Sequence, residues 1–331
     1  MLKSLMLSML SSPAAGSLLA AVQGRRSAIF MLHRFAVPDA GVRGHEERHV
    51  RSILAYLRQS GVEIVSADEL VTAEFVEPAS ARRRRARVAF TVDDGYFDFA
   101  ASGIDAFAAF DCPVTLFVAP GIIESGSWFW WDQVEWAFMH TERTQVTLQL
   151  DETVWGASWL NADQRRAAMQ DLVERLKGIP DALRRVVIAD LPSQLQVTLP
   201  LYAPATHRVL GWSELRALEA RGVRIGPHTM THPVLARCSE ETAAFEIEQS
   251  TRRVFQEMKN PSRIFCYPNG RVGDFGEREI ALLQKTPIQS AVSAEPGIAT
   301  PRQLPTAAWR WQVPRFAFES TSGMTARVLF L

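Results

Sequence analysis

Short apolar runs rich in β-branched residues alternate along this chain with longer stretches of helical periodicity. The helical stretches lie at 47–61, 99–111, 211–222 and 239–260. An alternation of this kind is typical of a protein built from βα units. The predicted strands are 28–32, 62–66, 87–92, 113–119, 223–226, 263–268 and 290–294, with a last one within 310–318.

Residues 127 to about 205 interrupt this rhythm. They begin with WFWWDQVEWAF and include a helical stretch, NADQRRAAMQDLVERLKGI. We interpret them as a mostly helical insertion between two βα units of a single domain at 27–331. Trp128, Trp130 and Trp131 are expected to anchor the insertion to its host, the alternative being that they stack on sugar faces.

The first 26 residues resemble a signal peptide only in part. They contain one early lysine, an apolar run and small residues, but SSPAAGS breaks the run. No window of about 18 apolar residues exists, so a spanning helix is not predicted. The prediction is an N-terminal helix that docks on the domain or lies on a membrane surface, in a cytoplasmic protein. Export through a cleaved leader is the alternative.

Composition argues against a nucleic-acid partner and against structural sites built from cysteine. Lysine plus arginine equals aspartate plus glutamate, 36 each, so overall charge does not favour a nucleic-acid partner. The three cysteines are far apart and form no CxxC motif, which argues against a disulfide framework and against a thiolate zinc site.

The stretch AFTVDDGYFDF places Asp93 and Asp94 at the end of a predicted strand. Side chains alternate across a strand, so the two carboxylates point in different directions. One can bind a metal while the other faces a substrate. Taken alone, the DDG sequence favours a solvated turn.

A histidine pair, His228 and His232, follows another predicted strand in IGPHTMTHPV. Prolines at both ends of this window argue against a helix and favour a rigid turn. A catalytic zinc site typically takes three protein ligands and keeps one position for water. The pair supplies two of them, and an aspartate from another strand end would supply the third. A structural role for both histidines is the alternative.

A third segment, FCYPNGR at 265–271, also ends a predicted strand. Pro268 and Gly270 stiffen a turn that can present backbone N–H groups. Three such segments, each at a strand end, point to one site.

These segments resemble the motifs of polysaccharide deacetylases, carbohydrate esterase family four. TVDDG resembles their TFDDG motif, HTMTH followed by Pro-Val-Leu resembles their HxxxH motif, and FCYPNG resembles their FAYPxG form. The resemblance runs from about residue 28 to 316, with the insertion outside it. It implies a distorted (β/α) barrel of about seven strands, with the active site at the strand C-termini. It also implies metal-dependent removal of N-acetyl groups from N-acetylhexosamine units of a polysaccharide or its precursor.

The same resemblance assigns roles to single residues. Asp94, His228 and His232 would hold a divalent metal, with zinc the first choice, and Asp93 would be the general base. The third motif would bind the substrate and its oxyanion through Asn269 and Tyr267, with the Asn269 backbone N–H as the donor.

Two departures from the family pattern change the expected site. The arginine that usually opens the third motif and orients the base is replaced by Phe265 or Cys266, and no histidine follows His232 to act as general acid. The segment MLHRF resembles the YHRV segment of exopolysaccharide deacetylases with a permuted order of motifs. First and last strands are neighbours in a closed barrel, so a histidine at the end of the first strand can occupy the position of one near the C-terminus. His33 is therefore the predicted acid. A structural histidine is the alternative.

Two further residues are assigned supporting roles. Arg315, in VPRFAF, resembles the LPR segment that ends such chains and is expected to orient a carboxylate. Asp274 is expected to support the residues that bind metal or substrate without binding either itself.

Two other functions remain open at this point. One is hydrolysis of another C–N bond, in a small amide or a cyclic imide, and the other is a metal-binding carbohydrate module without turnover.

Overall fold

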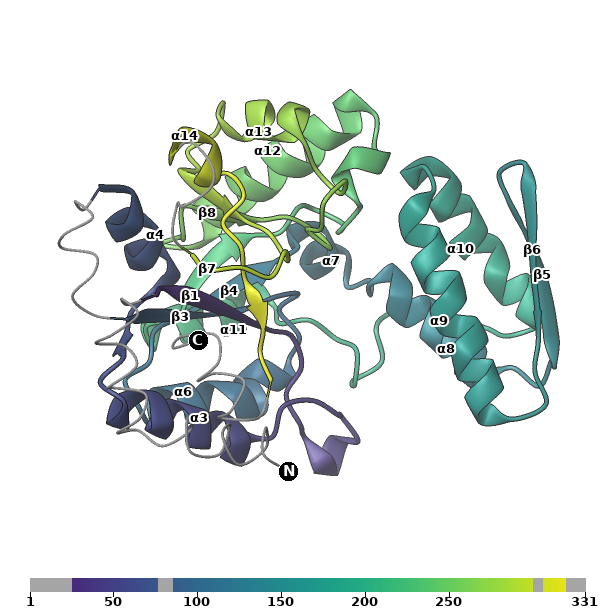
Figure 1. Ribbon diagram of the computed structural model, residues 1–331. Helices are drawn as coiled ribbons and strands as arrows, with labels where there is room; N and C mark the ends of the chain where they lie inside the picture. The colour runs from purple at the N-terminus through teal and green to yellow at the C-terminus, as the bar shows by residue number, and fades with distance from the viewer. Residues whose placement is uncertain (1–25, 77–85, 300–305, 320–331) are drawn as a thin grey trace, which may run out of the picture.

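The computed structural model describes residues 26–76, 86–299 and 306–319 (Figure 1). Its parallel strands are β1 (Ala28–Leu32), β2 (Glu63–Ile64), β3 (Arg87–Val92), β4 (Val114–Val118), β7 (Arg224–Pro227), β8 (Ile264–Cys266), β9 (Ser290–Val292) and β10 (Phe316–Ala317). They form a sheet in the order β10-β1-β3-β4-β7, with β2 paired to β3, and a separate parallel pair, β8-β9.

Two weaker links join these sheets into a distorted barrel. The Ser262 N–H donates to the Ile225 carbonyl at 2.8 Å, which brings β8 beside β7. On the other side, Val313 forms a parallel bridge with Val292 of β9. The α/β barrel class predicted from the sequence is therefore confirmed. The last predicted strand, 310–318, is shortened to β10, because residues 310–312 form a turn.

Helices pack around the outside of the strands, as Figure 1 shows. They are α3 (Glu47–Gln59), α4 (Ala67–Val76), α6 (Ile104–Ala108), α7 (Pro120–Ser125), α11 (Trp212–Ala220), α12 (Glu240–Glu257), α13 (Glu277–Leu283) and α14 (Thr306–Trp309). Short 3₁₀ turns lie at Pro38–Ala40 and Leu235–Arg237. The predicted helix 99–111 is α-helical only in α6, because its first turn, Phe99–Gly103, is a π-helix. The Phe35 ring packs so closely on Gly103 that a Cβ there would lie 2.8 Å from it.

Period-two alternation in the strands separates the outer layer from the barrel interior. Phe30 and Phe90 are paired across β1 and β3 and point outward, into the core under α3 and α6. Ile29 and Ala89, one residue earlier in each strand, point inward. Thr91 lies two residues after Ala89 in β3 and therefore also points inward. The same alternation places Asp93, which directly follows the strand, on the inner side.

Residues 130–195 form a lobe with its own core, drawn at the right of Figure 1. The strand β5 alternates exposed and buried residues, so only one face of its hairpin with β6 joins this core. Phe138, Leu172 and Leu191 are buried at its centre. The elements of the lobe are α8 (Trp130–His140), β5 (Gln145–Leu150), β6 (Thr153–Ser158), α9 (Ala162–Gly178) and α10 (Asp181–Leu195).

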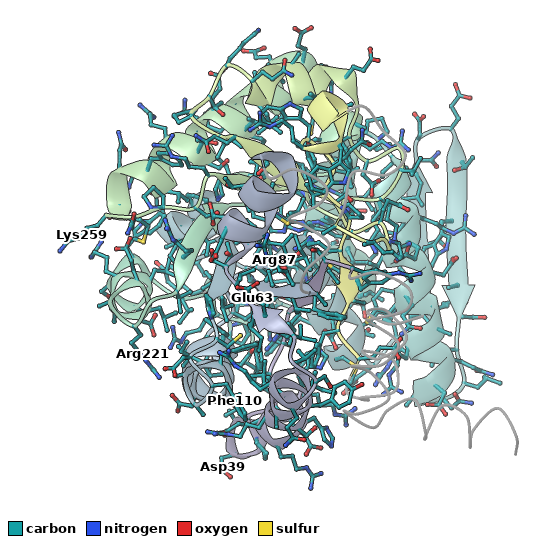
Figure 2. The ribbon with its side chains drawn as sticks, turned by 60° about the vertical axis from the view of Figure 1, so that its left-hand side comes forward. Asp39, Glu63, Arg87, Phe110, Arg221 and Lys259 are labelled. Carbon is teal, nitrogen blue, oxygen red and sulfur yellow. The ribbon has the colours of Figure 1, made fainter. Side chains whose placement is uncertain are left out.

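The N-terminal ends of the strands form one rim of the barrel, and the strand C-termini form the opposite rim. At the N-terminal rim the Arg87 guanidinium pairs with the Glu63 carboxylate at 3.2 Å, linking the starts of β3 and β2 (Figure 2).

In the described ranges, no helix is both long and apolar enough to cross a bilayer. The segment predicted at residues 1–26 lies outside the described residues, except for its last one.

We expect Gly226→Ala, in β7, to lower the free energy of unfolding by about 1–3 kcal/mol. Its new Cβ would lie 2.6 Å from the Phe117 ring and 3.1 Å from the Ile264 carbonyl oxygen, so the core would be overpacked. Gly178→Ala is the matched control, because a Cβ at this helical position meets no atom within 4 Å. Urea unfolding of both variants measures the difference. An equal stability of the two would contradict this account of β7.

Candidate active site

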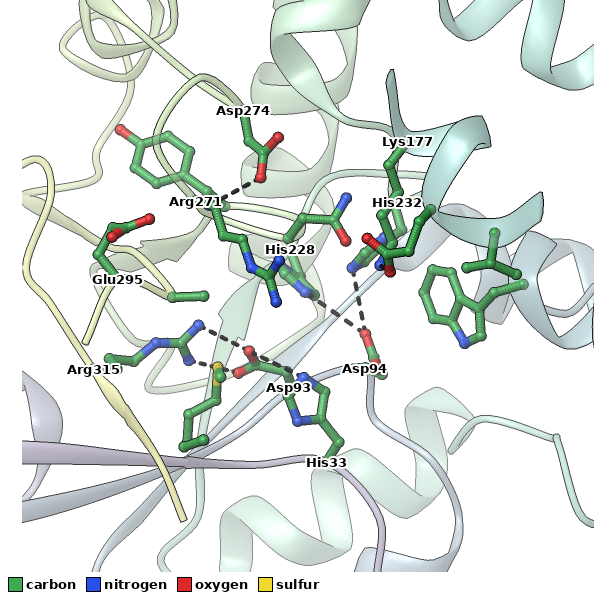
Figure 3. A pocket seen from close by; sticks show the side chains of 18 of the residues that line it. His33, Asp93, Asp94, Lys177, His228, His232, Arg271, Asp274, Glu295 and Arg315 are labelled. Atoms are coloured by element: carbon green, nitrogen blue, oxygen red, sulfur yellow. Dashed lines mark hydrogen bonds and ion pairs between the residues drawn. The ribbon is translucent and has the colours of Figure 1, made fainter. Parts of the chain in front are cut away.

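The strand register brings three predicted segments to one rim of the barrel. Leu32 pairs with Val92, so the residues that follow β1 and β3, His33 and Asp93, emerge side by side. The Asp93 N–H donates to the Leu32 carbonyl at 2.9 Å, and the His228 N–H donates to the Val118 carbonyl at 2.9 Å. These side chains line a cavity of about 1020 Å³ (Figure 3).

Asp94, His228 and His232 form a buried cluster on the floor of this cavity. The Asp94 Oδ1 atom lies 3.7 Å from His228 Nε2 and 3.6 Å from His232 Nε2. The His228 Nδ1–H donates to the Cys266 carbonyl at 2.7 Å. Because a carbonyl can only accept, this bond fixes the tautomer and turns the Nε2 lone pair toward Asp94.

The donor atoms of the cluster fit a divalent metal. Within the part of the chain that the structure describes, Asp94 Oδ1 is buried without a hydrogen-bond partner, although a buried carboxylate oxygen normally has one. Two imidazoles and a carboxylate are a donor set that zinc accepts. The ligand atoms of the three residues lie within 4.8 Å of one another.

Burial also sets the protonation of the cluster. It lowers the pKa of His228 to about 4 and that of His232 well below its usual value, so both imidazoles are neutral near pH 7. Burial, followed by the charges of Asp93 and Asp132, raises the pKa of Asp94 well above its usual value. A site that disfavours this negative charge gains free energy from an added cation, which favours the ionised carboxylate.

Backbone geometry at the cluster is unusual and is held in place by neighbours. Asp94, Thr229 and His232 have positive φ values of 73°, 62° and 60°, a conformation that costs free energy for residues other than glycine. The buried Glu246 of α12 accepts hydrogen bonds from the Met230 N–H at 2.7 Å and from the Thr231 N–H at 2.9 Å. This carboxylate therefore fixes the turn between the two histidines.

Asp93 forms a bidentate ion pair with Arg315 inside the barrel. The Arg315 Nη1 and Nη2 atoms donate to the two carboxylate oxygens at 2.8 Å and 2.9 Å. Burial alone would raise the pKa of Asp93, but the charge and hydrogen bonds of Arg315, together with His33 and His228, outweigh burial and hold that pKa well below the usual range. Asp93 is thus ionised, and its orientation is fixed.

Cys266, at the end of β8, completes the surroundings of this ion pair. Arg315 Nη2 donates to its sulfur at 3.1 Å, and the thiol lies 3.5 Å from Asp93 Oδ2. Burial raises the pKa of Cys266 well above its usual value, so it is a neutral thiol. The arginine expected at this point of the third motif is thus supplied by Arg315, from a later segment of the chain.

His33 lies at the edge of the cavity, with its Nε2 atom 3.9 Å from Asp93 Oδ2. Its side chain is 45% exposed, which leaves it open to a substrate. Removal from water lowers the pKa of His33, Asp93 opposes this change, and Arg315 adds to it.

The third motif lines the cavity through Tyr267 and Asn269, and Asp274 in the loop that follows it also lines the cavity. Tyr267 directs its hydroxyl away, to the Trp311 carbonyl at 3.0 Å, so only its ring lies at the site. Asn269 has a φ of 55° and a buried amide nitrogen without a partner among the described residues. Asp274 accepts from the Arg271 N–H at 2.9 Å, and so it braces the loop rather than the metal cluster.

The three tryptophans that open the insertion differ in exposure. Trp128 and Trp130 are buried, at 3% and 7% exposure. Trp131 lines the cavity, with its ring centre 4.5 Å from that of His232. Its indole N–H donates to the Tyr96 hydroxyl at 3.0 Å, which in turn donates to Asp132 at 2.7 Å.

The sequence analysis missed Glu246, and it expected Trp131 to anchor the insertion, with stacking on sugar faces as the alternative. Glu246 stands among the apolar positions of α12, between Ala243 and Ile247, where a carboxylate is out of place. This break in the helical pattern was the available signal. Trp131 was grouped with its two buried neighbours, because spacing alone does not show which tryptophan faces a cavity.

We expect Arg315→Gln to lower the free energy of unfolding at pH 7 by about 3–5 kcal/mol, because Asp93 is left buried and unpaired. In the wild type the folded pKa of Asp93 lies below the unfolded value. Its contribution to stability is therefore present above the unfolded pKa and is lost as the pH falls through the folded pKa. In the variant, protonation of the unpaired carboxyl begins at a higher pH.

The stability difference between wild type and Arg315→Gln should therefore narrow as the pH is lowered. Urea unfolding of both metal-free proteins across a pH series measures this difference. The double variant with Asp93→Asn should lose less stability than the sum of the two single variants. A stability loss that is independent of pH would contradict the proposed coupling.

Comparisons with known proteins agree with this geometry. The sequence matches the polysaccharide deacetylase family over residues 80–289. The fold is similar to that of the Streptococcus pyogenes deacetylase PplD in complex with acetate, at a TM-score of 0.58 and 13% identity, covering 92% of this chain and 99% of that one. It is also similar to IcaB from Ammonifex degensii, at a TM-score of 0.57 and 15% identity, covering 92% and 97%.

A third structure, the de-N-acetylase from Aggregatibacter actinomycetemcomitans, has a TM-score of 0.52 and 12% identity, covering 91% of this chain and 98% of that one. A search of curated proteins finds no significant match. At these identities the solved structures establish the fold, and the family match spans more than half of the chain. The chain therefore belongs to the polysaccharide deacetylase family, hydrolases that act on carbon–nitrogen bonds other than peptide bonds.

Proposed function

We propose that this enzyme removes N-acetyl groups from N-acetylhexosamine units of a polysaccharide or its precursor, with a divalent metal, zinc as first choice. The observation that carries the proposal is the juxtaposition of two carboxylates in opposite states. Asp94 faces two neutral imidazoles, while the neighbouring Asp93 is kept ionised by Arg315. Both line one cavity.

A divalent ion held by Asp94, His228 and His232 supplies Lewis acidity toward the acetamide carbonyl and toward water. Asp93 is the base that takes a proton from the attacking water, since it is ionised and fixed by two hydrogen bonds. His33 gives a proton to the leaving nitrogen. One water is consumed, and one acetate, one free amine and one proton are released as Asp93 and His33 return to their starting states.

The backbone around Asn269 is the proposed partner of the developing oxyanion. The residue stands in a left-handed turn beside Gly270, whose φ is 66°. An N–H in such a turn is fixed before the substrate arrives, and preorganised donors of this kind stabilise the charge that develops in the transition state. Tyr267 contributes the face of its ring to the substrate cavity.

We expect Asp94→Ala to lose both bound metal and activity, whereas Asp93→Asn keeps the metal and loses about 10²–10⁴-fold in kcat. The first variant removes a ligand, and the second removes only the base. Metal content by elemental analysis, together with acetate release from N-acetylated glycans, separates the two. Acetate release also distinguishes this reaction from hydrolysis of cyclic imides.

Two results would contradict these assignments. Turnover by Asp93→Asn at the wild-type rate would remove Asp93 as the base. Full metal content and activity in Asp94→Ala would remove the proposed metal site. Arg166→Ala is a suitable control for losses of metal or activity during expression and purification. Its side chain is 51% exposed on α9 and is absent from the cavity lining.

We expect His33→Gln to slow deacetylation by about 10²–10⁴-fold for a substrate with a poor amine leaving group. The loss should be much smaller for an activated anilide, whose leaving group needs no proton. Comparing kcat for the two substrates in wild type and variant tests the role of the acid. An equal loss for both substrates would assign His33 a structural role instead.

A further inference from the structure

The two histidines of the metal cluster are held in different ways. His228 donates from Nδ1 to the Cys266 carbonyl at 2.7 Å, so a hydrogen bond within the barrel orients its ring. The Nδ1 atom of His232 is buried and has no hydrogen-bond partner among the described residues. A histidine that binds a metal almost always has such a partner on its second nitrogen. The orientation of the His232 ring therefore depends on its backbone and on packing.

The backbone at His232 adopts a conformation that needs support. Its φ is 60° and that of Thr229 is 62°, and this left-handed region costs free energy for residues other than glycine. The His232 N–H donates to Thr229 Oγ1 at 3.0 Å. The buried Glu246 accepts from the Thr231 N–H at 2.9 Å and from the Thr231 hydroxyl at 2.6 Å. A strained turn persists only where its surroundings hold it in several ways.

The insertion supplies one of these supports from helix α10. Arg185 Nη2 donates to Thr231 Oγ1 at 3.3 Å and lies 3.8 Å from Glu246. The same guanidinium donates from Nε to Asp181, in the first turn of α10, at 2.7 Å. Because Thr231 directly precedes His232, this arginine joins the insertion to the metal-binding turn.

Four charged side chains meet at this junction, two of each sign. Arg184 and Arg185 both donate to the Asp181 carboxylate, and Arg185 also lies beside Glu246. Asp181, Arg184 and Glu246 are buried. A buried charge is costly unless it is paired, so the carboxylate of the barrel and the arginine of the insertion stabilise each other.

Aromatic side chains of the insertion pack on the His232 ring itself. The ring centres of Trp131 and Phe129 lie 4.5 Å and 5.6 Å from that of His232, and both rings meet it edge to face. The Trp131 indole is fixed in turn, because its N–H donates to the Tyr96 hydroxyl at 3.0 Å. Close packing of this kind restricts the imidazole to one rotamer.

We propose that the insertion is a positioning element for the metal site, with Arg185 and Trp131 setting the orientation of His232. This inference rests on the proposed function, in which His232 is a metal ligand. It gives the insertion a role in metal affinity and coordination geometry, separate from any contact with substrate. His228 is oriented within the barrel and does not depend on the insertion.

The first test measures the Kd for zinc of each purified protein by competition with a chromophoric chelator. We expect Arg185→Gln and Trp131→Leu each to raise this Kd by about 10–100-fold, the loss typical when a residue that orients a ligand is removed. Arg185→Lys keeps the positive charge and should recover part of the affinity. Arg166→Ala, an exposed arginine of α9 that is absent from the cavity lining, should keep the wild-type Kd.

The second test uses the visible absorption spectrum of the Co2+-substituted proteins, which reports coordination geometry without turnover. At saturating Co2+ we expect altered bands in Arg185→Gln and Trp131→Leu and the wild-type spectrum in Arg166→Ala. The Tm of each metal-free protein is measured in parallel, and we expect it to stay close to that of the wild type.

Three results would contradict these expectations. A wild-type Kd and a wild-type Co2+ spectrum in both Arg185→Gln and Trp131→Leu would overturn the inference. A rise in Kd that only follows a loss of Tm, or an equal rise in Arg166→Ala, would do the same. A wild-type protein that binds no zinc would instead overturn the metal-dependent function on which the inference rests.

Discussion

The buried ion pair between Asp93 and Arg315 is the interaction around which the barrel is organised. Arg315 uses all three of its nitrogens inside the barrel, donating to the Ser293 carbonyl, to Thr91 Oγ1, to both oxygens of Asp93 and to the sulfur of Cys266. Burying a guanidinium is costly unless its donors are paired, and here they are. The ends of three strands, β3, β8 and β9, thereby converge on one side chain near the C-terminus.

This pair also separates the properties of two adjacent aspartates. Asp93 continues the inward column of Ala89 and Thr91, which places it against Arg315 and keeps it ionised. Asp94 turns away through a left-handed backbone and faces the two neutral imidazoles. Environment therefore divides two chemically identical groups into a charged base and a carboxyl that gains from a cation. A swap of the two roles would require moving the arginine.

Local signals in the sequence were sufficient for most strands of the barrel and for the strand ends that carry Asp94, His228 and His232, but they did not predict the β5–β6 hairpin of the insertion. The structure brings these three side chains together, because parallel strands expose their C-termini on one rim. The site of the third-motif arginine shows where local signals stop. Phe265 and Cys266 occupy that segment, and the guanidinium comes from Arg315, about fifty residues later. VPRFAF suggested an orienting arginine, but only the register of β10 against β1 shows which carboxylate it reaches.

Glu246 and Trp131 illustrate a second limit, since each acts through a contact across the fold. Glu246 holds the turn between the histidines, and Arg185 of the insertion reaches the same turn from the other side. The position of the insertion follows from topology. It leaves the barrel after β4 and α7, at the C-terminal edge of the sheet, which is the rim that carries the site in βα folds. A long segment inserted there extends over the cavity, and helix α9 lines it because α8 and β6 pack on other sides of that helix.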